Sequence, residues 1–167
     1  MLIKFSDTEE VPRWIAINDD VMGGISKSRI ELSPTATALF SGQLALENKG
    51  GFASIRRRSD YYNLDGCTGV IFKVKGDGRT YQFRVKTDDL YDGVAYRTLF
   101  ATDARHWQTI ALPFDIFCAS FRVRPVPGAP VLRPEQIRQI GFLLADKQPG
   151  SFSLEIAWIK SFQAYKN

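Results

Sequence analysis

Apolar and polar residues alternate along much of this chain, and that alternation limits what the chain can fold into. The segment TYQFRVKT (80–87) places its aromatic and aliphatic side chains on one face and its polar side chains on the other. The segment SFSLEIAWI (151–159) repeats the pattern. Successive side chains of a β-strand point to opposite faces, whereas a helical pattern repeats about every 3.6 residues. Both segments are therefore predicted to be half-buried strands.

The same reading extends to most of the chain. Further strands are predicted in six segments: 38–46, 51–57, 69–76, 94–102, 106–112 and 139–145. Only RPEQIRQI (133–140) is predicted to form a helical turn, with Pro134 in a first-turn position. Many short strands separated by turn residues favour a sandwich or a barrel. No linker or internal repeat divides the sequence, so we predict one all-β domain over residues 1–167.

One pair of strands permits a prediction of register. Asp77-Gly78 is a favoured two-residue hairpin turn, and it would place Phe72 opposite Phe83. In this hairpin the outer face carries a row of cations: Lys73, Lys75, Arg84 and Lys86, with Arg97 from the next strand. Like charges on neighbouring strands repel, which either a solvated face or a face built for an acidic partner would explain. We assign these lysines and Arg84 to partner binding and leave both explanations open.

The remaining charged and metal-binding residues exclude several functions. The net charge of +4 is mildly basic, so it permits an acidic partner and does not call for nucleic acid. The run Arg56–Arg58 is expected to be a solvated strand end. Cys67 and Cys118 are expected to be free thiols, and His106, the single histidine, has no nucleophile motif beside it. No metal site and no cofactor are predicted.

The segment NDDVMGGIS (18–26) is the strongest candidate for a special loop. Asp19 and Asp20 could act as an acid/base pair, but adjacent residues on an extended chain point in opposite directions. A calcium ion suits loop carboxylates better, and a turn is the commoner role for an Asn-Asp-Asp run. No catalytic residue is predicted here.

We therefore interpret this segment mainly as architecture. Asn18 and Asp19 are expected to accept hydrogen bonds from backbone amides, and Gly23-Gly24 to form the bend before a strand near Ile25. Two further residues, Asp20 and Met22, would then be displayed as partner contacts.

The N-terminal sequence bears on location. MLIKF is followed by polar residues, so it lacks a signal-peptide core, and no stretch is long and apolar enough to span a membrane. Asp7, Glu9 and Glu10 are unlike a transit peptide, which avoids acids. A cytoplasmic location is predicted.

Four stretches, taken with NDDVMGGIS and with the order in which they occur, carry a resemblance to a known family. They are FSGQLALENKGGFASIR (40–56), VKGDGRTYQFRVKT (74–87), WQTIALPFDIF (107–117) and IGFLLADKQPGSFSLEIAWI (140–159). Together they resemble the complex I intermediate-associated protein 30 family over nearly the whole chain.

The resemblance implies a galactose-binding-like jelly roll, a β-sandwich of two antiparallel sheets, and relatives that are assembly factors of respiratory complex I. We therefore predict a non-catalytic binding module that acts through protein–protein contacts, with a partner such as a subunit of a membrane complex. The alternative is a carbohydrate-binding module, because the implied fold is shared with such modules and 13% aromatic residues could supply a stacking platform. A third hypothesis is an enzyme that uses Asp19 or Asp20.

Overall fold

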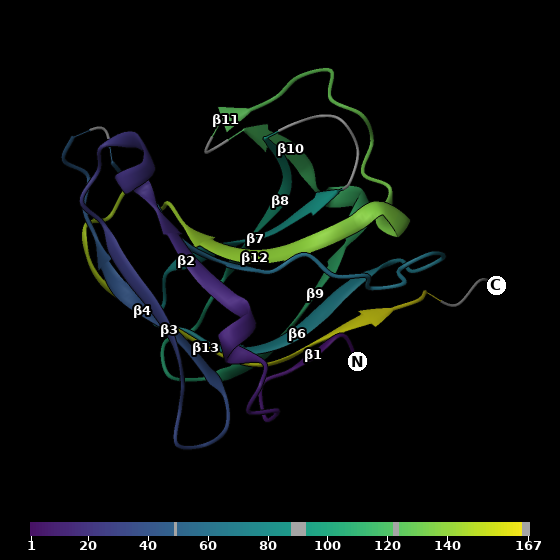
Figure 1. Ribbon diagram of the computed structural model, residues 1–167, viewed down its shortest axis with the longest axis horizontal. Helices are drawn as coiled ribbons and strands as arrows, with labels where there is room; N and C mark the ends of the chain where they lie inside the picture. Colours follow the sequence, from purple (N-terminus) through teal and green to yellow (C-terminus); the bar gives the residue numbers. More distant parts are fainter. Residues whose placement is uncertain (49, 88–92, 122–123, 165–167) are drawn as a thin grey trace.

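The computed structural model describes residues 1–48, 50–87, 93–121 and 124–164, and its strands form two antiparallel sheets packed face to face (Figure 1). One sheet has the order β3-β4-β13-β6-β9, with β1 against β13. Its strands are β1 (Ile3–Lys4), β3 (Lys27–Leu32), β4 (Ala38–Leu44), β6 (Gly69–Lys75), β9 (Trp107–Pro113) and β13 (Gly150–Phe162). We call it the β6 sheet.

The other sheet has the order β11-β10-β8-β7-β12-β5-β2, and we call it the β7 sheet. Its strands are β2 (Trp14–Asn18), β5 (Ala53–Arg57), β7 (Thr80–Thr87), β8 (Val94–Ala101), β10 (Cys118–Phe121), β11 (Arg124–Pro125) and β12 (Ile137–Leu144). Short 3₁₀ turns connect some of them: η1 (Val11–Arg13), η2 (Asp19–Met22), η3 (Phe114–Ile116) and η4 (Pro134–Gln136). The prediction of an all-β sandwich is confirmed, and η4 is the predicted helical turn.

Aromatic side chains from both sheets fill the space between them. Phe72 of β6 stacks on Phe83 of β7 with ring centres 5.2 Å apart. Phe142 of β12 and Phe100 of β8 contact Phe72 edge to face, with distances between ring centres of 5.5 and 4.9 Å. All four are buried, so the apolar faces read from the sequence meet in one shared core.

The predicted hairpin between residues 70 and 85 is wrong. β6 pairs with β13 and β9, whereas β7 pairs with β8 and β12, so the two strands belong to different sheets. Phe72 and Phe83 do meet, but across the core and not as neighbours in one sheet. The alternation could not separate these arrangements, because it records only which side chains face inward.

The turn at 76–79 is built as a crossing between sheets. The backbone N–H of Gly78 donates to Oγ1 of Thr102 at 3.1 Å, and this hydroxyl donates to the carbonyl of Arg79 at 2.7 Å. A Cβ at Gly76 would lie 2.3 Å from Thr102, so that position needs glycine. Asp77 is tied to the β6 sheet, because its carboxylate accepts the backbone N–H of Ser153 at 2.8 Å. These contacts hold the crossing in place of a hairpin.

The run Arg56–Arg58 is not a uniformly solvated strand end. Arg57 points inward and is only 5% exposed, while Arg56 points to the outer face and Arg58 is exposed. The guanidinium of Arg57 donates to Glu10, Asp60 and the hydroxyl of Tyr62. Alternation along β5 thus separates three consecutive arginines into different environments.

Candidate functional site

A groove lies on the outer face of the β7 sheet, the face turned away from the core. Its lining runs from Ile17 on β2 to Phe121 on β10, through residues of β5, β7, β8 and β12. Five strand spacings separate β10 from β2, about 24 Å in a flat sheet. A single groove of about 200 Å³ lined from both strands therefore requires the sheet to curl toward this face.

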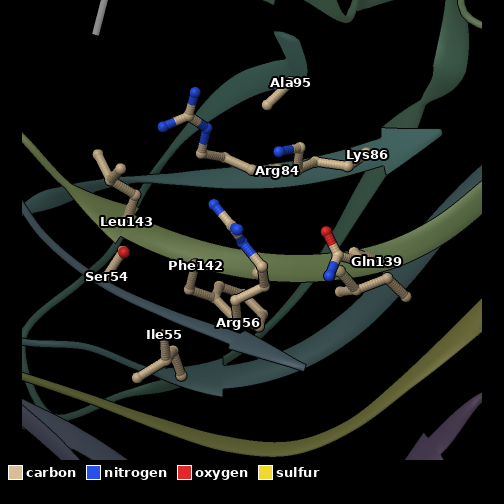
Figure 2. A pocket seen from close by; sticks show the side chains of 11 residues that line it. Ser54, Ile55, Arg56, Arg84, Lys86, Ala95, Gln139, Phe142 and Leu143 are labelled. Atoms are coloured by element: carbon tan, nitrogen blue, oxygen red, sulfur yellow. The ribbon is translucent and has the colours of Figure 1, made fainter. Parts of the chain in front are cut away.

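A row of arginines crosses this face of the sheet, and two of its members, Arg56 and Arg84, line the groove. Gly141 of β12 pairs with Arg56 on one side and with Arg84 on the other, and Arg84 pairs in turn with Arg97 of β8. We call Arg56, Arg84 and Arg97 the arginine row. Figure 2 shows Arg56 and Arg84 extending from their strands to the same side of the sheet, with Lys86 beside them.

Gly141 creates a small depression between two of these arginines. Because glycine has no side chain, nothing projects from β12 between Arg56 and Arg84. The resulting space of about 30 Å³ is lined by five polar residues, Ser54, Arg56, Arg84, Lys86 and Gln139, and also by apolar residues that include Ala95 and Leu143. We call it the Gly141 cup. This accessible volume exceeds the roughly 10–15 Å³ that one water molecule requires, so the cup can hold one small polar group.

Burial and mutual repulsion disfavour the charged forms of two arginines in this row. Burial, together with the positive charges of Arg97 and Arg56, lowers the pKa of Arg84 to about 10. Burial also lowers the pKa of Arg56. The guanidinium of Arg84 donates to Oγ of Ser120 at 2.9 Å, which fixes its direction in the sheet. A negatively charged ligand would relieve this repulsion.

The rest of the groove is apolar and carries no catalytic set within the described chain. Leu143, Phe121 and Ile17 form its apolar walls. Among the described residues, the lining includes no carboxylate, histidine, tryptophan or tyrosine. The same ranges hold no group of three or more His, Cys, Asp or Glu side chains placed to bind a metal. The arrangement suits binding of an anionic and partly apolar ligand.

The structure separates the four cations that the sequence placed on one face. Lys73 and Lys75 lie on the outer face of the β6 sheet, whereas Arg84 and Lys86 lie on the β7 sheet. Each lysine ammonium lies over the ring of Trp107, at 5.6 and 5.3 Å, and Lys75 pairs with Glu155 at 3.6 Å. The single cationic face is therefore wrong, because it depended on the hairpin. Any partner-binding role of these residues stays a prediction.

The loop after β2 is organised around a buried carboxylate. Asp19 accepts hydrogen bonds from the backbone N–H groups of Ser26, Gly51 and Phe52, at 2.9, 2.7 and 3.3 Å. Asn18 accepts one from the N–H of Ser54 at 3.2 Å. These contacts tie the loop to the chain before β3 and to the start of β5.

The two glycines of this loop have different reasons to be glycine. Gly23 has a φ of +88° at the end of η2, a conformation that other residues rarely adopt. A Cβ at Gly24 would lie 2.4 Å from Cγ of Asp19, so Gly24 makes room for the carboxylate. Asp20 is exposed, and the side chain of Met22 lies outside the described part of the structure. The partner contacts assigned to Asp20 and Met22 stay predictions.

Sequence reasoning singled out Arg84 and Lys86, which line the groove, but missed the residues beside them. Arg56 was assigned to a solvated strand end, Arg97 to the margin of a wrong face, and Gly141 to no role. The only available signal was that Arg56 and Arg97 occupy polar positions in strands whose polar and apolar residues alternate. The pairing of β5 with β12, distant in sequence, is what brings Arg56 to the groove.

Comparison with known proteins bears on fold, family and location. The chain is similar to a family 11 carbohydrate-binding module of a cellulosomal cellulase from Clostridium thermocellum, with a TM-score of 0.73 and 19% identity over 99% of this chain and 96% of that one. A second structure of such a module, in complex with a β-1,3-1,4-mixed-linked tetrasaccharide, gives a TM-score of 0.69 and 19% identity, over 96% and 95% of the two chains. At these identities the likeness shows the fold alone.

The curated relatives overturn the predicted cytoplasmic location. Complex I intermediate-associated protein 30, mitochondrial, from Mus musculus is 30% identical over 95% of this chain and 55% of its own length. The protein of the same name from Drosophila melanogaster is 25% identical over 95% of this chain and 61% of its own length. These names point to the mitochondrion. The acidic N-terminal residues were a poor guide, because a composition rule for transit peptides applies only to the targeting segment.

The chain spans a little over half the length of these relatives. None of its described helical turns could cross a membrane. The model of the complex I intermediate-associated protein 30 family matches residues 3–156. Because this match covers nearly the whole sequence, the chain belongs to the complex I intermediate-associated protein 30 family.

Proposed function

We propose that this chain is a non-catalytic binding module that assists the assembly of respiratory complex I by holding a protein partner in the groove of the β7 sheet. The observation that carries the proposal is the groove itself, where cations and apolar walls lie side by side. A binding surface that buries apolar side chains among arginines is typical of protein interfaces. The names of the mitochondrial relatives supply the complex in question.

A rescue experiment tests this function. Cells that lack the endogenous protein would be complemented with the wild-type chain, with Arg56→Glu in the groove, or with Arg29→Glu on the opposite sheet as the matched control. We expect wild type and Arg29→Glu to restore complex I on native gels, and Arg56→Glu to fail, because the reversed charge would repel the partner. Equal melting temperatures of the purified variants would show that folding is intact. Full rescue by Arg56→Glu would show that the groove is not needed for complex I assembly.

The alternative, a carbohydrate-binding module, is supported by the likeness of the fold to family 11 modules. The described lining of the groove lacks Trp and Tyr, the side chains that usually stack on sugar rings, and supplies arginines in their place. Calorimetry with the β-1,3-1,4 tetrasaccharide separates the two functions. We expect no measurable heat of binding, and saturable micromolar binding would favour the carbohydrate function.

A further inference from the structure

We propose that the Gly141 cup receives a carboxylate side chain from an extended acidic segment of the partner, with Arg56 and Arg84 on either side of it. This inference rests on the proposed function and adds the chemistry of the partner. In this arrangement the arginine row recognises the negative charge of the partner. The apolar walls of the groove contact the partner's neighbouring side chains.

The register of the sheet supplies the geometry. Arg56 and Arg84 are both in register with Gly141, so they lie two strand spacings apart, about 10 Å, with no side chain between them. Arginine binds carboxylates through its planar fork of N–H donors, which a lysine cannot match. An oxyanion above Gly141 would therefore have a guanidinium on each side. Any other residue at position 141 would fill this space, since its Cβ would also meet the carbonyl of Ile55 at 2.6 Å.

The charges around the cup favour an acidic ligand. Within the described residues, Arg56 and Arg97 form no ion pair, and no carboxylate lines the cup. Burial and the two neighbouring arginines act against the charged form of Arg84. Repulsive residues kept together at a cost to stability are typical of binding sites, where a ligand offsets the cost.

The walls of the groove favour a peptide over a small anion. Ile17 and Phe121 extend the lining beyond the cup, whose volume is about 30 Å³ in a groove of about 200 Å³. A free anion would contact only the cup. An extended segment alternates its side chains, so it can direct an acidic residue into the cup and apolar residues along the walls.

A peptide selection tests the inference without knowledge of the partner. A random dodecapeptide phage library would be panned against the wild-type chain, an Arg56→Gln/Arg97→Gln variant, and an Arg29→Gln control on the β6 sheet. We expect wild type and control to select peptides with Asp or Glu beside apolar residues, and the double variant to lose that enrichment. Peptides from the wild-type selection that lack acidic enrichment, or equal acidic enrichment on the double variant, would overturn the inference.

One selected peptide would then be synthesised with and without its acid replaced by the matching amide. We expect the amide peptide, or loss of Arg56 and Arg97, to weaken binding at least tenfold, and affinity of the acidic peptide to fall between 50 and 300 mM salt. Binding of inorganic phosphate at millimolar concentration with no peptide selected would overturn the inference and assign the cup to a small anion.

The free thiols offer a readout beside the arginine row. Cys118 is exposed and in register with Arg97, whereas Cys67 is half-buried outside this sheet. We expect a bound acidic peptide to slow alkylation of Cys118 at least threefold and to leave Cys67 unchanged. Equal protection of both thiols would contradict binding at the groove.

This result and the rescue experiment can fail separately. If acidic peptides bind at the arginine row and Arg56→Glu still rescues complex I, the row recognises carboxylates but the groove does not serve assembly. If rescue depends on Arg56 but the selected peptides lack acidic residues, the groove serves assembly but does not recognise a carboxylate.

Discussion

At the scale of single residues, Asp19 and Asp20 show how adjacent identical side chains acquire different roles. Asp19 is fully buried and accepts hydrogen bonds from three backbone N–H groups, whereas Asp20 is exposed. Gly24 in this loop and Gly50 in the connection before β5 make room for the carboxylate, since a Cβ at either would lie within 2.7 Å of it. A buried carboxylate that satisfies backbone donors stabilises the loop, and its loss would leave those donors unpaired.

The matched pair of aspartates gives a direct prediction. Asp19→Asn should lower the free energy of unfolding by about 3 kcal/mol, because the amide directs a donor at groups that are themselves donors. Asp20→Asn should change it by less than about 0.5 kcal/mol, as an exposed substitution usually does. Urea denaturation followed by circular dichroism measures both. Similar effects of the two variants would show that Asp19 does not hold the loop.

The arginine row gives a second prediction at this scale. Arg97→Gln should raise the melting temperature by about 1–3 °C, because removing one of several neighbouring like charges relieves repulsion of a few tenths to 1 kcal/mol. Arg29→Gln, which removes an equal charge from the β6 sheet, should leave the melting temperature within about 1 °C. Differential scanning fluorimetry at low salt would detect the shift. A lower melting temperature for Arg97→Gln would mean that the row stabilises the fold.

At the scale of elements, a buried ion pair connects the segment before η1 to the end of β5. Arg57 donates to Glu10 at 2.5 Å through Nε, and Trp14 donates its indole N–H to the same carboxylate at 3.1 Å. Burial alone would raise the pKa of Glu10, but the hydrogen bonds from Arg57 and Trp14 outweigh it and hold the pKa below its usual value of 4.5. The N-terminal segment is therefore fastened to the β7 sheet by a pH-dependent contact.

The sign of that dependence follows from the lowered pKa. The contribution of Glu10 is fully present above pH 4.5, the unfolded value, and is lost as the pH falls through the lower folded value. Glu10→Gln should cost about 3 kcal/mol at pH 7, because Arg57 then keeps only the half-exposed carboxylate of Asp60 as a charge partner. The difference between wild type and variant should shrink at pH 3. Unfolding free energies measured at both pH values test this, and a constant difference would exclude the ionised Glu10 as the cause.

At the scale of the whole molecule, one aromatic core joins the two sheets, so neither sheet should persist alone. Trp14 belongs to the β7 sheet, and Trp107 and Trp158 belong to the β6 sheet. In a Trp14→Phe variant, fluorescence reports only the β6 sheet; in a Trp107→Phe/Trp158→Phe variant it reports only the β7 sheet. In each variant the fluorescence and far-ultraviolet dichroism transitions should coincide in urea. Separate midpoints would show that the sheets unfold independently.

The sequence by itself determined where strands occur and which of their side chains face inward. The alternation from Tyr81 to Val85 became a strand with Tyr81, Phe83 and Val85 in the core. In the segment 151–159, a register shift after Ile156 leaves Trp158 half-buried and places Ile159 in the core. The sequence motifs also indicated the family and the jelly roll. Strands β1, β2, β10 and β11 were not predicted: β1 and β11 have only two residues each, and β11 also lies in proline-rich sequence that lacks a period-two pattern.

Only the tertiary structure decided which strands are neighbours. Periodicity is a local property, and it is identical for a hairpin and for a crossing between sheets. The turn at Asp77-Gly78 was therefore misassigned, and with it the face shared by Lys73 and Arg84. The candidate site depends on pairings between segments distant in the chain, Arg56 with Gly141 and Gly141 with Arg84. Long-range packing sets those pairings, because each strand must bury its apolar face against the opposite sheet.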